Sequence, residues 1–511
     1  MIRTLREQTW AIGLGLFALS FLVLYYLAGD VLHLGGDEGI YLQGGRLVAQ
    51  HQQPYRDFFA VTGPLSFWIE GALAWWSGMS LAAMRVPPLL DAAFLAWAVY
   101  WLAARYTSRS YAIGASLVLL AYEARIRQLS VNHRWDSAAL AVAAVVIAAR
   151  VERGGRPALW AAAGFLAAAA ACATPSMAVA AIPLLVWSCR GGKRALTAFL
   201  SGGAVAGVTA AIYLARNHAL QPFIQAMLWT RANYTQPNRV FYGGLGVRIP
   251  GAAPENGWLA AAGFAISLIP AIFPPAALAG WLLYLRGRKQ DGQLAEIAPM
   301  LGVVAALVLS AWPRWTSETL LFTLAPSWFL LAVLFYRLTN VQQRRWFCLT
   351  VLFATCVSLG NKVLATANYW PQETRVGEVR TPADEGEFLA HLEQWIRPGD
   401  SLFSFPYLPS VYYFLQAKNP TRYSYLQPGM MTAEDEQRAL AELKTSPPRW
   451  VIYENIPPEI ILAFWPASDP ARIPMAALDT YLGAHFHTVD NVAGPWGRVQ
   501  VMEGDAARPS Q

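Results

Sequence analysis

The chain has 511 residues, of which 55% are hydrophobic and 14% are charged, and its mean hydropathy is +0.32. A soluble enzyme of this size would carry more charge, so the composition excludes that class and indicates a polytopic membrane protein. The net charge of +7 would suit a nucleic-acid partner, but Lys and Arg form short clusters beside apolar runs. Clusters in such positions fix orientation in a membrane, so no nucleic-acid partner is predicted.

The first apolar run, Trp10–Ala28, follows Arg3 and Arg6 and shows no small-residue cleavage site after it. It predicts a retained first span with a cytoplasmic N-terminus. The segment that follows, 29–85, is then a first outer loop.

A span needs about 20 apolar residues to cross a hydrocarbon core of about 30 Å. With the basic clusters kept inside, the hydropathy predicts about eleven transmembrane helices in a domain covering 1–367. Second and third outer loops fall at 123–136 and 216–256. The other expected spans are 86–104, 111–122, 137–150, two Ala-rich spans bent at Pro175 and Pro183, 195–215, 258–285, 294–311, 319–336 and 346–365.

The remainder of the chain, 368–511, is richer in acidic residues. Helical periodicity occurs at 384–396 and 433–443, and short strand patterns occur at 401–405, 450–453 and 498–502. These patterns predict a small α/β domain. An odd number of spans places it on the outer side, opposite the N-terminus.

The first outer loop carries two adjacent carboxylates, Asp37 and Glu38, just after the first span. A helix-compatible segment follows, with apolar residues at Ile40, Tyr41, Leu47 and Val48. It predicts an amphipathic helix at the membrane surface. The run 64–78 is apolar but short, which favours a second interfacial or re-entrant helix.

The outer loops combine carboxylates, guanidinium groups and aromatic rings, a set suited to sugar transfer from a lipid phosphate. A phosphate leaving group needs cations rather than a general acid, and the acceptor hydroxyl needs one carboxylate as base. Asp37 is the candidate base. Arg56 and Arg134 are candidate phosphate partners, supported by Arg231, Arg239, Arg248 and Arg314.

Each of these residues also has a purely structural interpretation. The acidic pair can be a solvated helix cap, Asp136 can stabilise a helix N-terminus, and Arg56 can pair with Asp57. His133 can ligate a divalent metal together with Asp37 and Asp136, although no close ligand spacing supports this.

Three segments carry a resemblance to a known family: DEGIYLQGGRLVAQHQQPYRDF, GPLSFWIEGALAWWSG and AAMRVPPLLDAAFLAW. They resemble the membrane glycosyltransferases of the GT-C superfamily, in particular the bacterial branch related to protein O-mannosyltransferases and to the lipid A aminoarabinose transferase. The likeness covers residues 10–150 and, by layout, the later spans. The tail segment SFPYLPSVYYFLQAKNPTRY is similar to outer domains of bacterial members.

The resemblance implies the site residues and the reaction. It implies that the essential acid is Asp37 with Glu38 beside it, and that Asp136 is the acid that ends the second outer loop. The reaction implied is an inverting displacement from a polyprenyl-phosphate sugar at the periplasmic face of a bacterial inner membrane. Several relatives have Lys-Pro-Pro or His-Pro-Pro where this chain has Thr62, Gly63 and Pro64. Together with the charged and aromatic groups of the outer loops, this gives the predicted substrate and phosphate residues: Tyr41, Tyr55, Arg56, Asp57, Arg134 and Asp136.

The function predicted is that of a hexosyl- or pentosyltransferase with a lipid, glycan or protein acceptor. Some relatives use a divalent metal, and for this chain Asp37 and Asp136 are the candidate ligands. Two alternatives stay open. A transporter or flippase of lipid-linked glycans would place ionisable residues or broken helices near the middle of the bilayer. Asp91 lies inside the second span, but early and alone, and the only candidate breaks are Pro175, Pro183 and Pro274/Pro275. A scaffolding protein would explain the tail but not the first loop.

Overall fold

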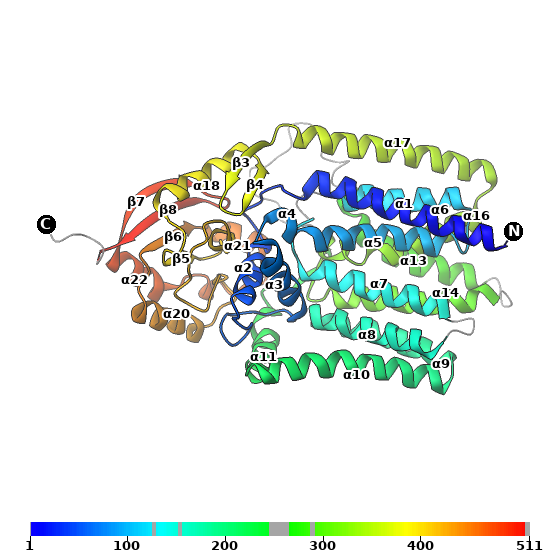
Figure 1. Ribbon diagram of the computed structural model, residues 1–511, viewed down its shortest axis with the longest axis horizontal. Helices are drawn as coiled ribbons and strands as arrows, with labels where there is room; N and C mark the ends of the chain where they lie inside the picture. The colour runs from blue at the N-terminus through cyan, green and yellow to red at the C-terminus, as the bar shows by residue number, and fades with distance from the viewer. Residues whose placement is uncertain (1, 125–128, 152–155, 245–264, 287–291, 506–511) are drawn as a thin grey trace.

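The computed structural model describes residues 2–124, 129–151, 156–244, 265–286 and 292–505. A bundle of long, nearly parallel helices forms one part of the molecule, and a mixed region of helices and strands lies at one end of it (Figure 1). The bundle contains α1 (Ile2–Ala28), α5 (Val86–Ala103), α6 (Arg109–Glu123), α7 (His133–Val151), α8 (Pro157–Ala173), α9 (Ala178–Arg190), α10 (Lys193–Arg216), α13 (Ile269–Arg286), α14 (Gly292–Ser310), α16 (Leu324–Leu338) and α17 (Val341–Thr366).

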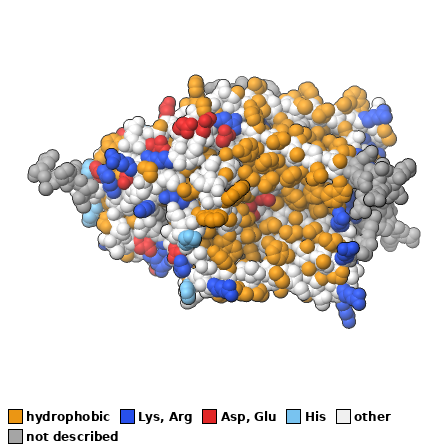
Figure 2. Space-filling view, viewed as in Figure 1, with side chains coloured by type: hydrophobic (Ala, Val, Ile, Leu, Met, Phe, Trp, Pro, Cys, Tyr) orange, Lys and Arg blue, Asp and Glu red, His pale blue; other side chains and the backbone are white. Residues whose placement is uncertain are grey.

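Five helical segments of the described chain are long and apolar enough to cross a membrane. They are Trp10–Ala28, Leu81–Ala103, Lys193–Arg216, Ile269–Arg286 and Val341–Thr366. Shorter apolar helices occupy Pro157–Ala173, Pro175–Arg190, Ile297–Ser310 and Leu324–Leu338. The outer face of the bundle is covered with hydrophobic side chains, and Lys and Arg side chains lie at the end away from the strands (Figure 2).

The expected span 319–336 is broken into α15 (Ser317–Leu321) and α16. Pro326 explains the break, because it has no N–H to bond the carbonyl of Phe322 and its ring would clash there. The start of the expected span 258–285 lies partly outside the described residues. Pro175 begins a 3-10 turn, η2 (Pro175–Met177), that separates α8 from α9 as the sequence predicted.

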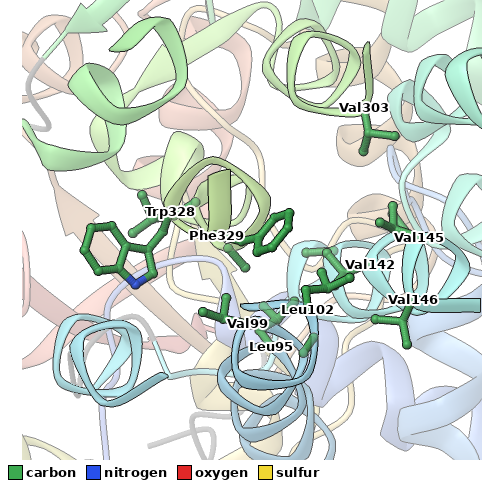
Figure 3. Packing of buried hydrophobic residues seen from close by; sticks show 14 of the residues in the cluster. Leu95, Val99, Leu102, Val142, Val145, Val146, Val303, Trp328 and Phe329 are labelled. Atoms are coloured by element: carbon green, nitrogen blue, oxygen red, sulfur yellow. The ribbon is translucent and has the colours of Figure 1, made fainter. Parts of the chain in front are cut away.

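The core of the bundle draws on most of its helices, and Figure 3 shows the part where residues of α5, α7, α14 and α16 pack together. Val99 of α5, Val142 of α7 and Phe329 of α16 are each at most 2% exposed. The indole nitrogen of Trp328 donates to the carbonyl of Ala115, 2.7 Å away. In lipid, close packing and such hydrogen bonds hold helices together, because lipid tails are as apolar as the side chains.

The first outer loop folds into α2 (Glu38–Ala49), α3 (Leu65–Ser77) and α4 (Leu81–Met84). For the first of these helices, the sequence predicted an amphipathic helix at a membrane surface. In the structure that helix is instead enclosed: residues Glu38, Gln43 and Arg46 are all buried. It packs against α3 on one side and α19 (Ser410–Phe414) of the tail on the other.

Between the bundle and the tail lie α11 (Leu220–Trp229), η3 (Thr230–Tyr234), β1 (Val240–Gly244) and β2 (Arg314–Thr316). The two strands pair in parallel. The rest of the third outer loop, 245–256, lies outside the described residues.

The tail contains a four-stranded sheet in the order β5-β6-β8-β7. β5 and β6 are parallel, and the other two pairs are antiparallel. Besides α19, the helices and strands of the tail are β3 (Trp370–Thr374), β4 (Gly377–Thr381), α18 (Ala383–Trp395), β5 (Leu402–Phe405), α20 (Ala433–Thr445), β6 (Trp450–Asn455), α21 (Pro458–Phe464), η4 (Pro470–Arg472), α22 (Ala476–His485), β7 (Phe486–Ala493) and β8 (Arg498–Gly504). The two predicted helices and three predicted strands of the tail agree in position with α18, α20, β5, β6 and β8. The edge strand β7 was not predicted, because Thr488, Asp490 and Asn491 interrupt its apolar pattern.

The tail is joined to the first outer loop by direct contacts. The guanidinium of Arg380 binds the carboxylate of Asp30 at 2.8 Å, and the Ser410 hydroxyl donates to the Leu34 carbonyl at 2.7 Å. A Cβ at Gly39 would lie 2.3 Å from the backbone nitrogen of Ser410, so only glycine permits this approach. The tail therefore covers the loop that carries the acidic pair.

Candidate active site

A cavity of about 410 Å³ lies where the first outer loop, the start of α7, the α15 region and the tail meet. Its lining includes Asp37, Tyr41, Arg134, Arg314 and Tyr407. These residues come from positions spread over almost the whole chain. The cavity combines two exposed carboxylates, Asp37 and Glu318, with two guanidinium groups and several aromatic rings.

Asp37 stands at the N-cap position of α2, but its side chain makes no capping hydrogen bond. The preceding Gly36 has φ +100°, a conformation that favours glycine and turns the chain into the cavity. Asp37 is exposed, and its Oδ1 accepts a 2.6 Å hydrogen bond from the hydroxyl of Tyr407. Its carboxylate is therefore available to a ligand rather than used to cap the helix.

Glu38 differs from Asp37 in its burial and in its hydrogen-bond partners. It is 3% exposed, and its Oε1 and Oε2 accept from Arg85 at 2.8 Å and 2.6 Å. Its Oε1 also accepts from the backbone nitrogen of Val131 at 3.0 Å. Arg85 in turn donates to the carbonyls of Ala28 and Val31. The sequence grouped Glu38 with Asp37 as catalytic, whereas the structure engages both its oxygens in an ion pair that ties three segments together.

Two arginines supply positive charge to the cavity. Arg134 lies at the start of α7, and Arg314 begins β2 and donates to the carbonyl of Phe464 at 2.8 Å. Within the described residues, neither forms an ion pair with a carboxylate. Both act on Tyr234, whose pKa is raised mainly by burial and lowered by these two cations. Their charge is thus available to an anion in the cavity.

Buried tyrosine hydroxyls line the same space. Desolvation, with a further contribution from Asp37, raises the pKa of Tyr41, Tyr407 and Tyr425. All three hydroxyls therefore stay protonated. Tyr41 also stacks on His133, with ring centroids 5.5 Å apart. Of the predicted substrate residues, Tyr41 and Arg134 line the cavity with Asp37.

The structure places Tyr55, Arg56 and Asp57 away from the cavity lining. Arg56 binds Asp57 through two hydrogen bonds of 2.8 Å and 2.7 Å and donates to the Asn217 carbonyl. The hydroxyl of Tyr55 donates to the Thr62 carbonyl at 2.5 Å. This is the structural pairing that the sequence offered as the alternative for Arg56.

Asp136 is buried on α7 and is likewise absent from the cavity lining. Its carboxyl group hydrogen-bonds Ser66 of α3 and Asp91 of α5. Asp91 is the only charged residue within α5, as expected, and the first turn of α7 brings Asp136 beside it.

Several cavity residues were missed by the sequence prediction, chiefly Tyr407, Gln427, Trp465 and Trp496 of the tail. One signal could have found part of this set. Tyr407 lies two residues after β5 and Ile456 directly follows β6, and ligand sites favour the carboxyl ends of parallel strands such as these.

Comparison of the sequence with known proteins found no match, whereas comparison of the structure with solved structures found several. No family model matches the chain, and no curated protein matches it in sequence. The structure matches ArnT from Cupriavidus metallidurans bound to undecaprenyl phosphate with a TM-score of 0.58 and 13% identity, over 98% of this chain and 99% of that one. It also matches the oligosaccharyltransferase AglB from Archaeoglobus fulgidus, with a TM-score of 0.53 and 10% identity, over 98% of this chain and 75% of that one.

Both of these proteins have the fold of the GT-C glycosyltransferases. The likeness extends over nearly the whole chain, through the bundle, the first outer loop and the tail. The chain therefore has the GT-C glycosyltransferase fold that its first outer loop predicted.

Proposed function

We propose that this protein is an inverting glycosyltransferase that moves a sugar from a polyprenyl-phosphate donor to a hydroxyl acceptor. One observation carries the proposal. The exposed carboxylate of Asp37, which caps no helix, shares a cavity with Arg134 and Arg314, and neither arginine has a carboxylate partner among the described residues. A carboxylate base facing two available cations is the minimum that this reaction needs.

The chemistry assigns a separate role to each group. The acceptor hydroxyl oxygen attacks the anomeric carbon and gives its proton to Asp37. The bond from that carbon to the phosphate oxygen breaks, and the polyprenyl phosphate leaves with the electron pair. Arg134 and Arg314 stabilise the charge that grows on the phosphate. Attack opposite the leaving group inverts the anomeric configuration.

The similar structures support a lipid-phosphate donor. ArnT was crystallised with undecaprenyl phosphate, and AglB with dolichol-phosphate and an inhibitory peptide. We extend the lipid-phosphate class of donor to this chain on the strength of its two arginines. The acceptor is a lipid, a glycan or a protein, and the sugar is a hexose or a pentose.

Tyr407 and Glu38 act as positioning residues in this proposal. The hydroxyl of Tyr407 fixes the carboxylate of Asp37, and the Glu38–Arg85 pair holds the turn from which Asp37 projects. A role for Glu38 as base would require the loss of its two bonds to Arg85.

A divalent metal was considered because AglB has also been crystallised with zinc and sulfate. The residues that the structure describes do not fit such an ion. In the described part, no three His, Cys, Asp or Glu side chains gather as a ligand set. Asp136, the predicted partner of Asp37, is bonded to Ser66 and Asp91 instead. No step of the proposed reaction passes through a metal.

We also propose the topology expected from the sequence: about eleven spans in 1–367, with the N-terminus in the cytoplasm and 368–511 forming an outer, periplasmic α/β domain of a bacterial inner membrane. Two observations support it. The N-terminus and the tail lie at opposite ends of the bundle (Figure 1). Basic side chains gather at the end near the N-terminus, beyond the hydrophobic surface (Figure 2).

Asp37→Asn tests the proposed reaction. Envelope glycolipids and glycans are compared by mass spectrometry in cells with the native protein, without the protein, with Asp37→Asn and with the control Asp57→Asn. We expect the deletion and Asp37→Asn to lose the same sugar mass, and Asp57→Asn to keep it, because Asp57 binds Arg56 and the backbone nitrogen of Gln53 outside the cavity lining. If Asp37→Asn leaves the glycans intact while the deletion alters them, the base is wrong and transport of lipid-linked glycans becomes the better function.

A further inference from the structure

One wall of the cavity is an aromatic arc built entirely from the tail. It runs through Tyr425, Tyr407, Trp465, Phe464 and Trp496, all of which line the cavity. Successive ring centroids are 5.4, 5.7, 5.7 and 4.9 Å apart. Contacts of this length form a continuous surface of ring faces and edges.

The aromatic arc passes directly beside the proposed base. Tyr407 donates its hydroxyl to Asp37, and Trp496 packs on Gly35, two residues earlier in the chain. A Cβ at Gly35 would lie 2.9 Å from Cζ2 of Trp496, so glycine is needed for this contact. A group bound against the aromatic arc therefore lies within reach of Asp37.

Gln427 adds a polar donor to the same wall. It is 4% exposed and lines the cavity, and its Nε2 has no hydrogen-bond partner among the described residues. Buried amide donors without a partner are rare because they lose their bonds to water and gain none in return. The residue lines the cavity, so a ligand acceptor that its side chain turns to meet would satisfy this donor.

We infer that the aromatic arc and Gln427 form the subsite for the donor sugar, an inference that rests on the function proposed above. The C–H face of the sugar ring packs on the aromatic arc, and Gln427 Nε2 donates to a ring hydroxyl. The arginines that hold the phosphate belong to α7 and β2. The tail thus selects the sugar, while the bundle and its loops hold the lipid phosphate.

Binding of two kinds of probe to the full-length protein in detergent separates these roles. One probe is undecaprenyl phosphate, and the others are undecaprenyl-phosphate-linked mannose, glucose, galactose and arabinose. The affinity ratio between a sugar-linked probe and the bare lipid phosphate measures the contribution of the sugar subsite. The probe with the largest ratio is then measured on Gln427→Leu.

Gln427→Leu should lower that ratio about tenfold, as expected for one lost hydrogen bond to a ligand, and leave affinity for undecaprenyl phosphate unchanged. Its Tm should stay the same or rise, because no internal hydrogen bond of Nε2 is lost. The matched control is Gln43→Leu. Gln43 is 1% exposed and accepts from Arg46 at 3.3 Å outside the cavity, so this variant should lower Tm and keep the ratio.

Each contrary result has a distinct meaning. An unchanged ratio in Gln427→Leu, a fall in its Tm, or a ratio near one for every sugar tested overturns the sugar subsite while the lipid-phosphate function stands. If undecaprenyl phosphate itself does not bind the native protein, the proposed function fails and the subsite fails with it.

Discussion

The hydroxyl of Tyr407 donates a hydrogen bond of 2.6 Å to Oδ1 of Asp37, across 370 positions of sequence. Asp37 belongs to the first outer loop, and Tyr407 follows strand β5 of the tail. Because the contact joins the two regions at the proposed base, the tail is part of the site. The relationship makes the orientation of Asp37 depend on how the tail is docked.

Removal of this hydroxyl should slow the reaction without unfolding the protein. In Tyr407→Phe, Asp37 loses one orienting hydrogen bond, and we expect kcat to fall about tenfold, which corresponds to about 1.4 kcal/mol. The control is Tyr453→Phe, which removes a 3.1 Å bond to Asp479 within the tail and away from the cavity lining. Equal rates for the two variants would contradict the positioning role.

Loss of a cavity arginine should weaken binding of the lipid phosphate. A hydrogen bond to a charged group contributes about 1.5–3 kcal/mol, so Arg134→Gln should lower affinity for undecaprenyl phosphate by about tenfold to a hundredfold. Titration of the purified protein with that lipid measures the change. Arg56→Gln should bind like the native protein, since Arg56 is paired with Asp57 at 2.7 Å outside the cavity. The opposite order of affinities would restore Arg56 as the phosphate partner.

The buried pair Glu38–Arg85 should matter mainly for stability. Both side chains are 2% exposed, and Glu38→Ala would leave the Arg85 charge buried without its partner. We expect a loss of about 3–5 kcal/mol in the free energy of unfolding. Heating followed by size-exclusion chromatography reports the loss. In Glu503→Ala, which breaks an exposed 3.3 Å pair with Arg449, the change should stay below about 1 kcal/mol. A stable Glu38→Ala without activity would instead indicate a catalytic Glu38.

Glu454 should make the stability of the tail depend on pH. Its carboxyl is 1% exposed in β6, and burial raises its pKa to about 7, against the opposing hydrogen bonds from the backbone of Trp496 and Gly497. A raised carboxyl pKa favours the folded state at low pH. Its stabilising contribution is fully present below the unfolded value of about 4.5 and is lost as pH rises through about 7.

The size of this change is about 3 kcal/mol between those limits. Measurement of Tm from pH 4.5 to 8.5 should show the decline, and Glu454→Gln should flatten it while the backbone nitrogen of Trp496 keeps an acceptor. Glu503→Gln, on the neighbouring strand β8, should preserve the slope of the native protein. A native Tm that is constant over this range would refute the assignment.

The sequence by itself determined the membrane helices and the position of the proposed base. Apolar runs of span length and basic residues at their ends are local signals, since each depends only on neighbouring residues and the properties of lipid. The same local patterns located α3, α18, α20 and three tail strands. The motif around Asp37 predicted the GT-C fold, which the structural comparisons confirm. The count of eleven spans and the role of the tail stay predictions.

The tertiary structure alone decided which charged groups share a cavity. Asp37 and Glu38 are adjacent in sequence and both line the cavity, yet Asp37 is exposed while Glu38 is buried in its pair with Arg85, because successive residues at a helix start point in different directions. Arg56 forms an ion pair with the next residue, Asp57, whereas Arg134 and Arg314 both lie close enough to Tyr234 to lower its pKa.

The tail residues that line the cavity could not be predicted from the sequence either. Tyr407, Gln427 and Trp496 line the same cavity as Asp37 although hundreds of residues separate them from it in the chain, and such proximity leaves no periodic pattern in the sequence. Their positions depend on close packing at Gly35 and Gly39, where any side chain would push the tail away. The sequence therefore determined which chemical groups are available, and packing of the tail on the first loop decided which of them meet.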